Sequence, residues 1–381
     1  MRCSITCVYN TARPCFDMIG RPEDDHIQLF LDTLERQTFK SFEVVIADCI
    51  YDRREEHVED NTYRNKKYPF QIYHIKVNSP WLKHGCWAGQ CGWNHGALLA
   101  NGELFLTFGD CCELPPHYLE KIWDWYMKGY WCMGLVIYKK DGKLFMYQDV
   151  EDEAEEDEEY EFYRNINNTR KSWARGIIGN LRELKRRGVI KDLVRDSRWI
   201  YVDKVGVIKL KGRSGAQLFH GYSCLPLQAL LKINGFDENF DGDKALGDVA
   251  TGISLWMAGY DNVLVLDKDV WLYENAHKAV PEDVLWYKGP SIRSNFSLLC
   301  LNELKRRWRA NSYRLTEEEV EWMVEHGKDW GFKDIDVRAN PLFQKWLENP
   351  PIFDLQELRW EVQDNLEDGI VELPEYYRWD E

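Results

Sequence analysis

Short apolar segments alternate with segments of helical periodicity over the first 110 residues, and this alternation limits the fold more than any other feature. Apolar runs of strand length occupy 3–9, 42–47, 70–77 and 103–108. Residues 24–37 carry apolar side chains at helical spacing, and 92–100 form a short predicted helix. Alternating strands and helices predict an α/β fold with a mostly parallel sheet, which binds ligands at the carboxyl ends of its strands. The loops after residues 9, 47 and 108 are therefore the candidate binding loops.

Length, charge and cysteine usage narrow the class of protein. The chain has 381 residues and is 44% hydrophobic, enough for one large α/β domain with appendages or for two domains. A net charge of −15 argues against a protein that coats nucleic acid or anionic membrane with its whole surface. No apolar run reaches membrane-spanning length, and no signal peptide is expected. Eleven cysteines without a CxxC pair make a zinc site unexpected, and reduced thiols predict a cytoplasmic protein.

A change of composition separates the two halves of the sequence. Residues 149–161 contain ten acidic side chains in thirteen positions, which cannot form a core and predict a solvated loop. The next segment, 170–198, has ten Lys or Arg against three acidic residues and a helical, amphipathic pattern. We therefore expect 145–215 to be a charged helical insertion. Residues 216–289 return to the sheet, and 290–381 are expected to form a helical C-terminal extension.

Five segments, in the same order along the chain, resemble family-2-type inverting glycosyltransferases. Residues 4–10 (SITCVYN) and 31–48 (LDTLERQTFKSFEVVIAD) are similar to the opening of that family. Residues 92–103 (GWNHGALLANGE) resemble its RNxGxxxAxGE stretch, and 106–120 (LTFGDCCELPPHYLE) stand where the metal-binding segment lies. Residues 219–260, which contain NGFDE, resemble the acceptor half. Each segment is weak evidence alone, whereas the ordered set is specific.

The resemblance implies a GT-A fold, which is Rossmann-like with a mostly parallel central sheet. It implies a nucleotide-sugar-binding half in 1–144 and an acceptor and catalytic half in 216–289, with the insertion near the acceptor side. The activity implied is that of a hexosyltransferase. Such an enzyme moves a sugar from a nucleotide-diphospho-sugar, here a UDP-hexose, to an acceptor hydroxyl with inversion.

Residues on the donor side follow from the matching motifs. The resemblance implies that Asp48 accepts a hydrogen bond from uracil or ribose, with Tyr9 as a flat wall for the base; a capping role is the alternative for Asp48. Asn10 is either a nucleotide contact or an ordinary strand end. Asn94 matches the family, but Trp93 stands where the family has Arg. This substitution leaves in doubt a positive contact to the donor.

The metal-binding segment departs from the family's DxD pattern. The segment reads Gly-Asp-Cys-Cys-Glu over 109–113, so Asp110 is the acid retained in the core triplet. Hard cations prefer oxygen to sulfur, so the two cysteines are poor ligands. We expect Asp110, Glu113 and the distant His277 to bind Mn²⁺ or Mg²⁺. A surface-loop histidine is an equal alternative for His277, and Lys or Arg could replace the metal.

Asp248 is the candidate general base. An inverting transfer needs one group that takes the acceptor proton, and the family places it at the start of the helix after NGFDE. The alternative is that Asp248 only caps that helix. Asp243 is a second candidate for the base. Asp237 and Glu238 are expected to fix the loop rather than act on substrate.

The acceptor is not specified by the motifs. A saccharide or lipid-linked sugar is the default by analogy, with Trp93 and Trp256 as candidate acceptor contacts. A hydroxymethylated base in duplex DNA is an alternative because 170–198 could contact phosphates, although pairing with the acidic loop is favoured. A protein acceptor is also open. A catalytically degraded sugar-nucleotide-binding protein is the last alternative, and the absence of a GxGxR-type loop argues against a nucleotidyltransferase.

Overall fold

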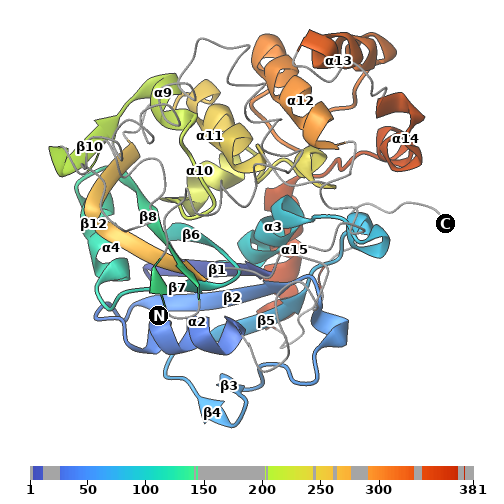
Figure 1. Ribbon diagram of the computed structural model, residues 1–381. Coiled ribbons are helices and arrows are strands. Elements are labelled where there is room, and N and C mark those ends of the chain that lie inside the picture. The colour runs from blue at the N-terminus through green and yellow to red at the C-terminus, as the bar shows by residue number, and fades with distance from the viewer. Residues whose placement is uncertain are drawn as a thin grey trace.

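A five-stranded sheet forms the centre of the computed structural model. The model describes residues 3–11, 26–140, 143–144, 202, 205–242, 246–260, 264–275, 291–329, 337–367 and 373. The sheet order is β11-β6-β1-β2-β5, parallel throughout except for β11 (Figure 1). Its strands are β1 (Ile5–Thr11), β2 (Phe42–Asp48), β5 (Ile72–Lys76), β6 (Leu104–Gly109) and β11 (Cys224–Pro226). The predicted α/β fold with a mostly parallel sheet is confirmed.

The parallel strands end at one edge of the sheet. Thr11 at the end of β1 pairs with Asp48 at the end of β2, and Asn10 pairs with Gly109 at the end of β6. Lys76 at the end of β5 lies beside Asp48. The three loops singled out from the sequence therefore leave the sheet together, as the carboxyl ends of neighbouring parallel strands must.

Alternate residues of β1 face different helices, because successive side chains of a strand point to opposite faces. On one face, Tyr9 stacks on Phe30 of α2 (His26–Glu35) with ring centroids 4.5 Å apart. On the other face lies α3 (Gly89–Leu99). A Cβ on Gly96 of α3 would lie 2.3 Å from the Val8 side chain, so the helix packs this closely only because the residue is glycine.

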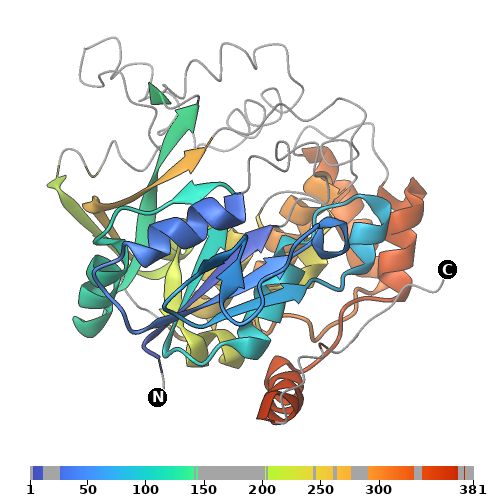
Figure 2. The same ribbon diagram turned by 90° about the horizontal axis from the view of Figure 1, so that it is seen from below.

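A second sheet lies beside the first and is joined to it by a bridge between Met133 and Ser223. The long strands β8 (Trp131–Lys140) and β12 (Leu264–Asn275) run parallel, and Figure 2 shows them side by side. The remaining strands and the adjacent helix are β7 (Cys112–Glu113), β9 (Lys143–Leu144), β10 (Val207–Leu210) and α4 (Tyr118–Met127). Because β10 pairs with β12, the end of the expected helical insertion belongs to this sheet.

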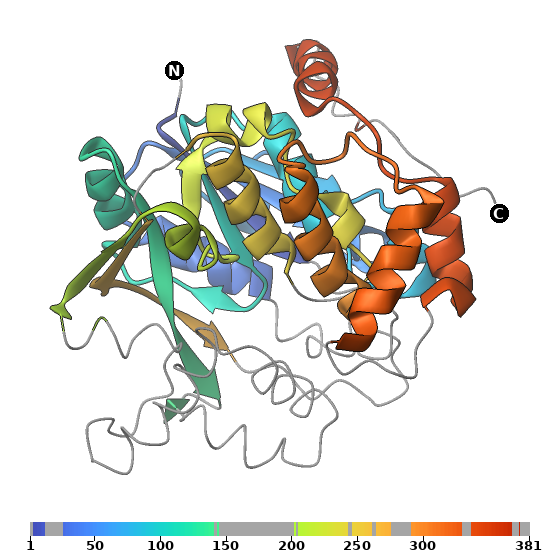
Figure 3. The same cartoon turned by 90° about the horizontal axis from the view of Figure 1, so that it is seen from above.

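Helices predominate toward the C-terminus, and the described residues after 290 contain helices and no strand, as expected. The helices are α9 (Gly212–Ala216), α10 (Leu227–Lys232), α11 (Gly247–Met257), α12 (Ser291–Lys305), α13 (Glu317–Asp329), α14 (Pro341–Glu348) and α15 (Leu355–Glu367). Figure 3 shows α11, α12 and α13 in a row above the sheet. Short elements complete the described chain: η1 (Tyr51–Arg53), β3 (Thr62–Tyr63), β4 (Lys66–Lys67), η2 (Pro80–His84), η3 (Glu238–Phe240) and η4 (Val337–Ala339).

The C-terminal helices are bonded into the core through two asparagines. Asn234 donates from Nδ2 to the carbonyls of Ala310 and Phe353, both at 2.7 Å, and accepts from the Leu355 amide. Asn311 donates to the carbonyl of Asn234 at 3.0 Å. The extension from 290 is therefore continuous with the α/β core. No helix in the described part of the chain is long and apolar enough to cross a membrane.

Candidate active site

The turn after β6 carries Asp110 and is held from two sides. Cys111 has a left-handed backbone (φ 67°), which is costly for a residue other than glycine. Its amide donates to the Tyr9 hydroxyl at 3.2 Å, and its carbonyl accepts from the backbone and side-chain nitrogens of Asn275. Asp110 is 5% exposed. The turn thus fixes the Asp110 carboxyl at the edge where β1, β2 and β6 end.

Of the expected metal ligands, Asp110 lies on this turn and Glu113 lies in β7, which follows it directly. Glu113 accepts a hydrogen bond at 3.0 Å from Asn275, the last described residue of β12. His277 follows two residues later and lies outside the described residues. Within the described ranges, no group of three or more His, Cys, Asp or Glu could hold a metal ion.

The two cysteines of the turn do not add ligands. Both side chains are buried, and burial raises the pKa of the Cys112 thiol well above its usual value, with a further contribution from Glu274. Hard cations prefer oxygen to sulfur, and the Cys112 thiol already donates to the Gly109 carbonyl at 3.3 Å. Asp110 and Glu113 supply oxygen ligands of the type that Mn²⁺ or Mg²⁺ takes.

Tyr9 and Asn10 point to opposite faces of the sheet, because successive side chains of a strand alternate. Tyr9 is fully buried against Phe30 and supports the turn at Cys111, so it does not present a free wall to a base. Asn10 faces α3 instead, where its Nδ2 donates to the Gly89 carbonyl at 2.6 Å. Its Oδ1 is buried and has no hydrogen-bond partner among the described residues.

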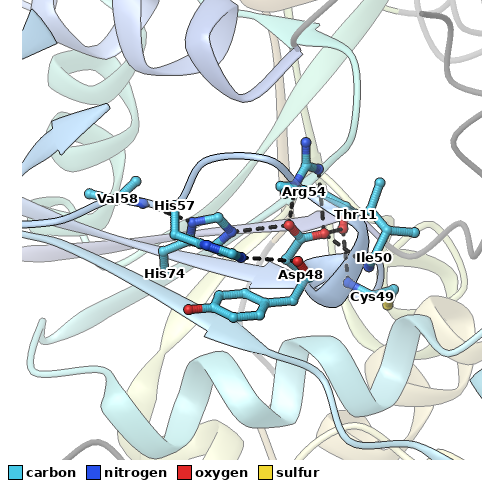
Figure 4. A network of polar contacts seen from close by, with 9 residues as sticks. Thr11, Asp48, Cys49, Ile50, Arg54, His57, Val58 and His74 are labelled. Atoms are coloured by element: carbon cyan, nitrogen blue, oxygen red, sulfur yellow. Dashed lines mark hydrogen bonds and ion pairs between the residues drawn. The ribbon is translucent and has the colours of Figure 1, made fainter. Parts of the chain in front are cut away.

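Asp48 is the centre of a buried polar network (Figure 4). Its Oδ1 accepts from the Thr11 hydroxyl at 2.6 Å and from the Ile50 amide at 3.0 Å. Its Oδ2 accepts from the Arg54 guanidinium and lies 3.0 Å from His74 Nε2. Because the protein fills both oxygens of this fully buried carboxylate, a direct contact to uracil or ribose does not agree with the geometry.

The network also fixes the charge states. Burial alone would raise the pKa of the Asp48 carboxyl, but the hydrogen bond from His74 and the charge of Arg54 outweigh it and hold that pKa well below its usual range. Burial lowers the pKa of His74, and its Nδ1 accepts from the Val58 amide at 3.2 Å. His74 is therefore a neutral ring that donates from Nε2 to an ionised Asp48.

Asn94 is a structural clamp, and this corrects its expected contact to the donor. Its Nδ2 donates to the Phe236 carbonyl and to Glu238 Oε1, both at 2.8 Å. Its Oδ1 accepts from the Phe236 amide at 2.7 Å. The side chain is fully buried, so these three bonds commit it to holding α3 against the loop 234–238.

The acidic loop after Asn234 also serves the fold, in agreement with the role expected for Asp237 and Glu238. Asp237 accepts from the Tyr313 hydroxyl at 2.8 Å and from Asn239. Asp241, which the sequence motifs did not single out, accepts from the amides of Gln90 and Cys91 at 2.8 and 2.9 Å. It therefore caps the N-terminus of α3 from 150 residues away in the sequence, and no local pattern announces such a cap.

Asp248 lies in the first turn of α11, as predicted. The residue before this helix, Leu246, has a left-handed backbone (φ 69°), a costly conformation of the kind often found at functional sites. Asp248 is only partly buried. One oxygen accepts from the Val249 amide at 2.8 Å. Asp243, the second candidate for the base, lies outside the described residues.

The two tryptophans take different places. Trp93 is buried, with its ring 5.1 Å from that of Phe236, so it packs in the core rather than as an exposed platform. Trp256 stands eight residues after Asp248 on α11, which at 1.5 Å per residue is about 12 Å along the axis. Trp256 is therefore at the other end of the helix and does not share the Asp248 site.

Close contacts around the first turn of α3 link the strand ends to α11; we call them the α3 contact ring. The ring pairs Asn10 with Gly92, Gln90 with Gly247, Trp93 with Gly221 and Tyr222 with Gly109. An added Cβ would lie 2.4 Å from Asn10 at Gly92 and 2.2 Å from Gln90 at Gly247, so each glycine lets its backbone lie directly against the neighbouring amide side chain. Asp110 follows Gly109 and Asp248 follows Gly247. The ring is thus a path of contacts from Gly109, which precedes Asp110, to Gly247, which precedes Asp248, and it includes two residues that the motifs missed, Gln90 and Tyr222.

No protein-family model matches this sequence, and a search of curated proteins finds no match. Among solved structures, S. aureus TarS matches with 12% identity and a TM-score of 0.42, over 98% of this chain and 49% of that one. This chain therefore spans about half the length of that TarS chain. S. aureus TarS 1–349 in complex with UDP matches with 12% identity and a TM-score of 0.41, over 99% of this chain and 98% of that one. Its complex with UDP-GlcNAc matches with 11% identity and a TM-score of 0.41, over 99% of each chain. Similarity at this level carries no argument about activity.

Proposed function

We propose that the chain is a GT-A-type glycosyltransferase that moves a sugar from a UDP-hexose to an acceptor hydroxyl with inversion. The observation that carries the proposal is the α3 contact ring, because it joins the turn with Asp110 to the N-terminus of α11 with Asp248. A transfer of this kind needs one group facing the diphosphate and another facing the acceptor. The ordered motifs of the sequence support the same assignment.

The donor side lies at the carboxyl ends of β1 and β6. Asp110 and Glu113 would hold Mn²⁺ or Mg²⁺, which offsets the negative charge that grows on the leaving diphosphate. Asn10, which pairs with Gly109 in the sheet, has a buried Oδ1 with no hydrogen-bond partner among the described residues. Asp48 and Tyr9 hold the loops at this edge in place, because Asp48 accepts from the Ile50 amide and the Tyr9 hydroxyl accepts from the Cys111 amide.

Asp248 is proposed as the general base. Within the described part of the chain the Val249 amide engages Oδ1 of Asp248, and Oδ2 is the oxygen proposed to receive the proton of an acceptor hydroxyl. The acceptor oxygen attacks the anomeric carbon as the bond to the diphosphate breaks, and the hydroxyl proton passes to Asp248. The N-terminus of α11 favours a negative charge at this position. The proposed acceptor is a saccharide or lipid-linked sugar.

The departure of residues 109–113 from the DxD pattern favours a second candidate function. Of these residues only Asp110 and Glu113 are oxygen ligands, and no larger cluster occurs in the described ranges. A sugar-nucleotide-binding protein without transferase activity would show this pattern. UDP release separates the two functions, because a binding protein takes up UDP-sugar without turning it over.

The test compares wild type with Asp248→Asn. UDP release is measured from UDP-GlcNAc and UDP-glucose, with and without Mn²⁺ and in the presence of candidate acceptors, and product mass identifies the transfer. We expect Asp248→Asn to lose at least 10²-fold in rate, since general-base catalysis contributes about 10²–10⁴-fold. Its UDP affinity should stay unchanged. Asp124→Asn, on the exposed face of α4, is the control. Normal turnover by Asp248→Asn would refute the base assignment.

A further inference from the structure

Three buried polar groups without partners gather at the first turn of α3. The Oδ1 of Asn10, the Oε1 of Gln90 and the Nε1 of Trp93 have no hydrogen-bond partner in the described part of the chain. Their side chains are 1%, 4% and 6% exposed. Native proteins pair almost all buried polar atoms, so an unpaired group usually has a bound partner that completes it.

These groups lie around the start of α3. Gln90 and Trp93 are three residues apart on α3, which places them on neighbouring parts of the helix surface. The Gln90 amide lies against Gly247, next to Asp248, and Asn10 lies against Gly92. All three therefore belong to the α3 contact ring, between the proposed base and the strand ends that carry Asp110.

The chemistry of the three groups selects the ligand. The two amide oxygens accept hydrogen bonds and the indole N–H donates one. An anionic phosphate brings only acceptors, so the amide oxygens would repel it. A sugar ring presents hydroxyls that donate and accept, and it is neutral. We infer that Asn10, Gln90 and Trp93 form the subsite for the hexosyl group of the donor, an inference that rests on the proposed function.

The expected signature is a gain in stability together with a loss of sugar binding. Gln90→Met keeps the length of the side chain and removes the unpaired amide. Replacing an unpaired buried amide with an apolar side chain should raise the Tm of the ligand-free protein. The same variant should bind UDP like wild type but lose the additional affinity for UDP-GlcNAc or UDP-glucose, by about 3- to 10-fold.

Gln37→Met is the matched control. Gln37 is also buried, but its amide is fully paired: Nε2 donates to the carbonyls of Thr33 and Pro115, and Oε1 accepts from the Leu119 amide. This variant should lower the Tm and leave the ratio of UDP-sugar to UDP affinity unchanged. Trp93→Phe, which keeps an aromatic side chain but removes the N–H with the smaller ring of the indole, should behave like Gln90→Met in sugar binding.

Calorimetric titration with UDP, UDP-GlcNAc and UDP-glucose, together with thermal unfolding, decides the case. If Gln90→Met and Trp93→Phe keep the wild-type ratio of UDP-sugar to UDP affinity, the subsite is refuted while the transferase proposal stands. A fall in Tm for Gln90→Met as large as that of Gln37→Met would also overturn it, because the amide would then have a structural partner. If wild type neither binds nor turns over any UDP-sugar, the proposed function fails and the subsite with it.

Discussion

At the scale of single residues, Asp48 shows how a motif residue can be placed correctly and still serve another purpose. Its position at the end of β2 was predicted, but its partners Arg54 and His74 come from a loop and from β5. Sequence reasoning could not find them, because nothing in the local pattern shows that an arginine six residues later folds back onto the strand end. The carboxylate therefore organises the edge of the sheet.

Asp48→Asn should destabilise the protein by roughly 3 kcal/mol. The change removes the negative charge that pairs with Arg54, which is 9% exposed, and removing one partner of a buried ion pair typically costs about 3–5 kcal/mol. Urea unfolding followed by circular dichroism measures the loss. Asp32→Asn is the control, since its ion pair with Lys66 is about one-third exposed and should contribute less than about 1 kcal/mol. Equal losses in the two variants would contradict the assignment.

Asp110→Asn tests the metal at the turn after β6. The amide keeps the size of the side chain and removes the charge that would bind a divalent cation. We expect the affinity for UDP in the presence of Mn²⁺ to fall about 10-fold or more, as for loss of a charged hydrogen bond or ligand. Affinity without Mn²⁺ should change little. Calorimetric titration in both conditions measures the difference, and equal losses would remove the metal from the role given to Asp110.

At the scale of elements, the strands and helices of the first half follow from periodicity, whereas the side-chain partners across them do not. Residues 42–47 and 103–108 were predicted as strands and are found as β2 (Phe42–Asp48) and β6 (Leu104–Gly109). A strand at β1 also has a two-residue period, which predicts that Tyr9 and Asn10 face opposite sides of the sheet. The sequence does not predict the structural role of Asn94, because its hydrogen-bond partners Phe236 and Glu238 lie more than 140 residues away along the chain.

Asn94→Ala should therefore lower the free energy of unfolding rather than the affinity for UDP. It breaks three buried hydrogen bonds to Phe236 and Glu238 and should cost about 3 kcal/mol or more in the free energy of unfolding. Chemical denaturation measures this. Asn349→Ala, which loses one long bond at 3.4 Å, should change stability by less than about 1 kcal/mol. A stable Asn94→Ala protein that fails to bind UDP would restore the donor contact expected from the sequence.

At the scale of the whole molecule, the boundaries drawn from composition are less sharp than the fold. The change at 290 marks the start of helices, yet Asn234 and Asn311 bond those helices to the core loop. Likewise, β10 belongs to the second sheet although the sequence placed it in the charged insertion. Composition records where side chains are charged, whereas domain boundaries depend on long-range hydrogen bonds that composition does not contain. The acidic and basic segments 149–161 and 170–198 lie outside the described residues.

The pH dependence of unfolding is a property of the whole chain to which His95 contributes with a definite sign. Burial lowers the pKa of His95 from 6.5 to about 4, and the ring is fixed by the Cys91 carbonyl at 2.8 Å and the Asn78 amide at 3.4 Å. As the pH falls from 7 to 4, the unfolded chain takes up a proton at this residue while the folded chain does not. The free energy of unfolding therefore falls by up to roughly 3 kcal/mol from this residue.

Asp237 and Asp241, whose pKa values burial raises, contribute with the opposite sign, so the difference between wild type and His95→Gln is the quantity to measure. In urea titrations, the free energy of unfolding of wild type relative to that of His95→Gln should fall steadily as the pH decreases from 7 to 4.5. An advantage that stays constant over this range would show that His95 protonates equally in both states.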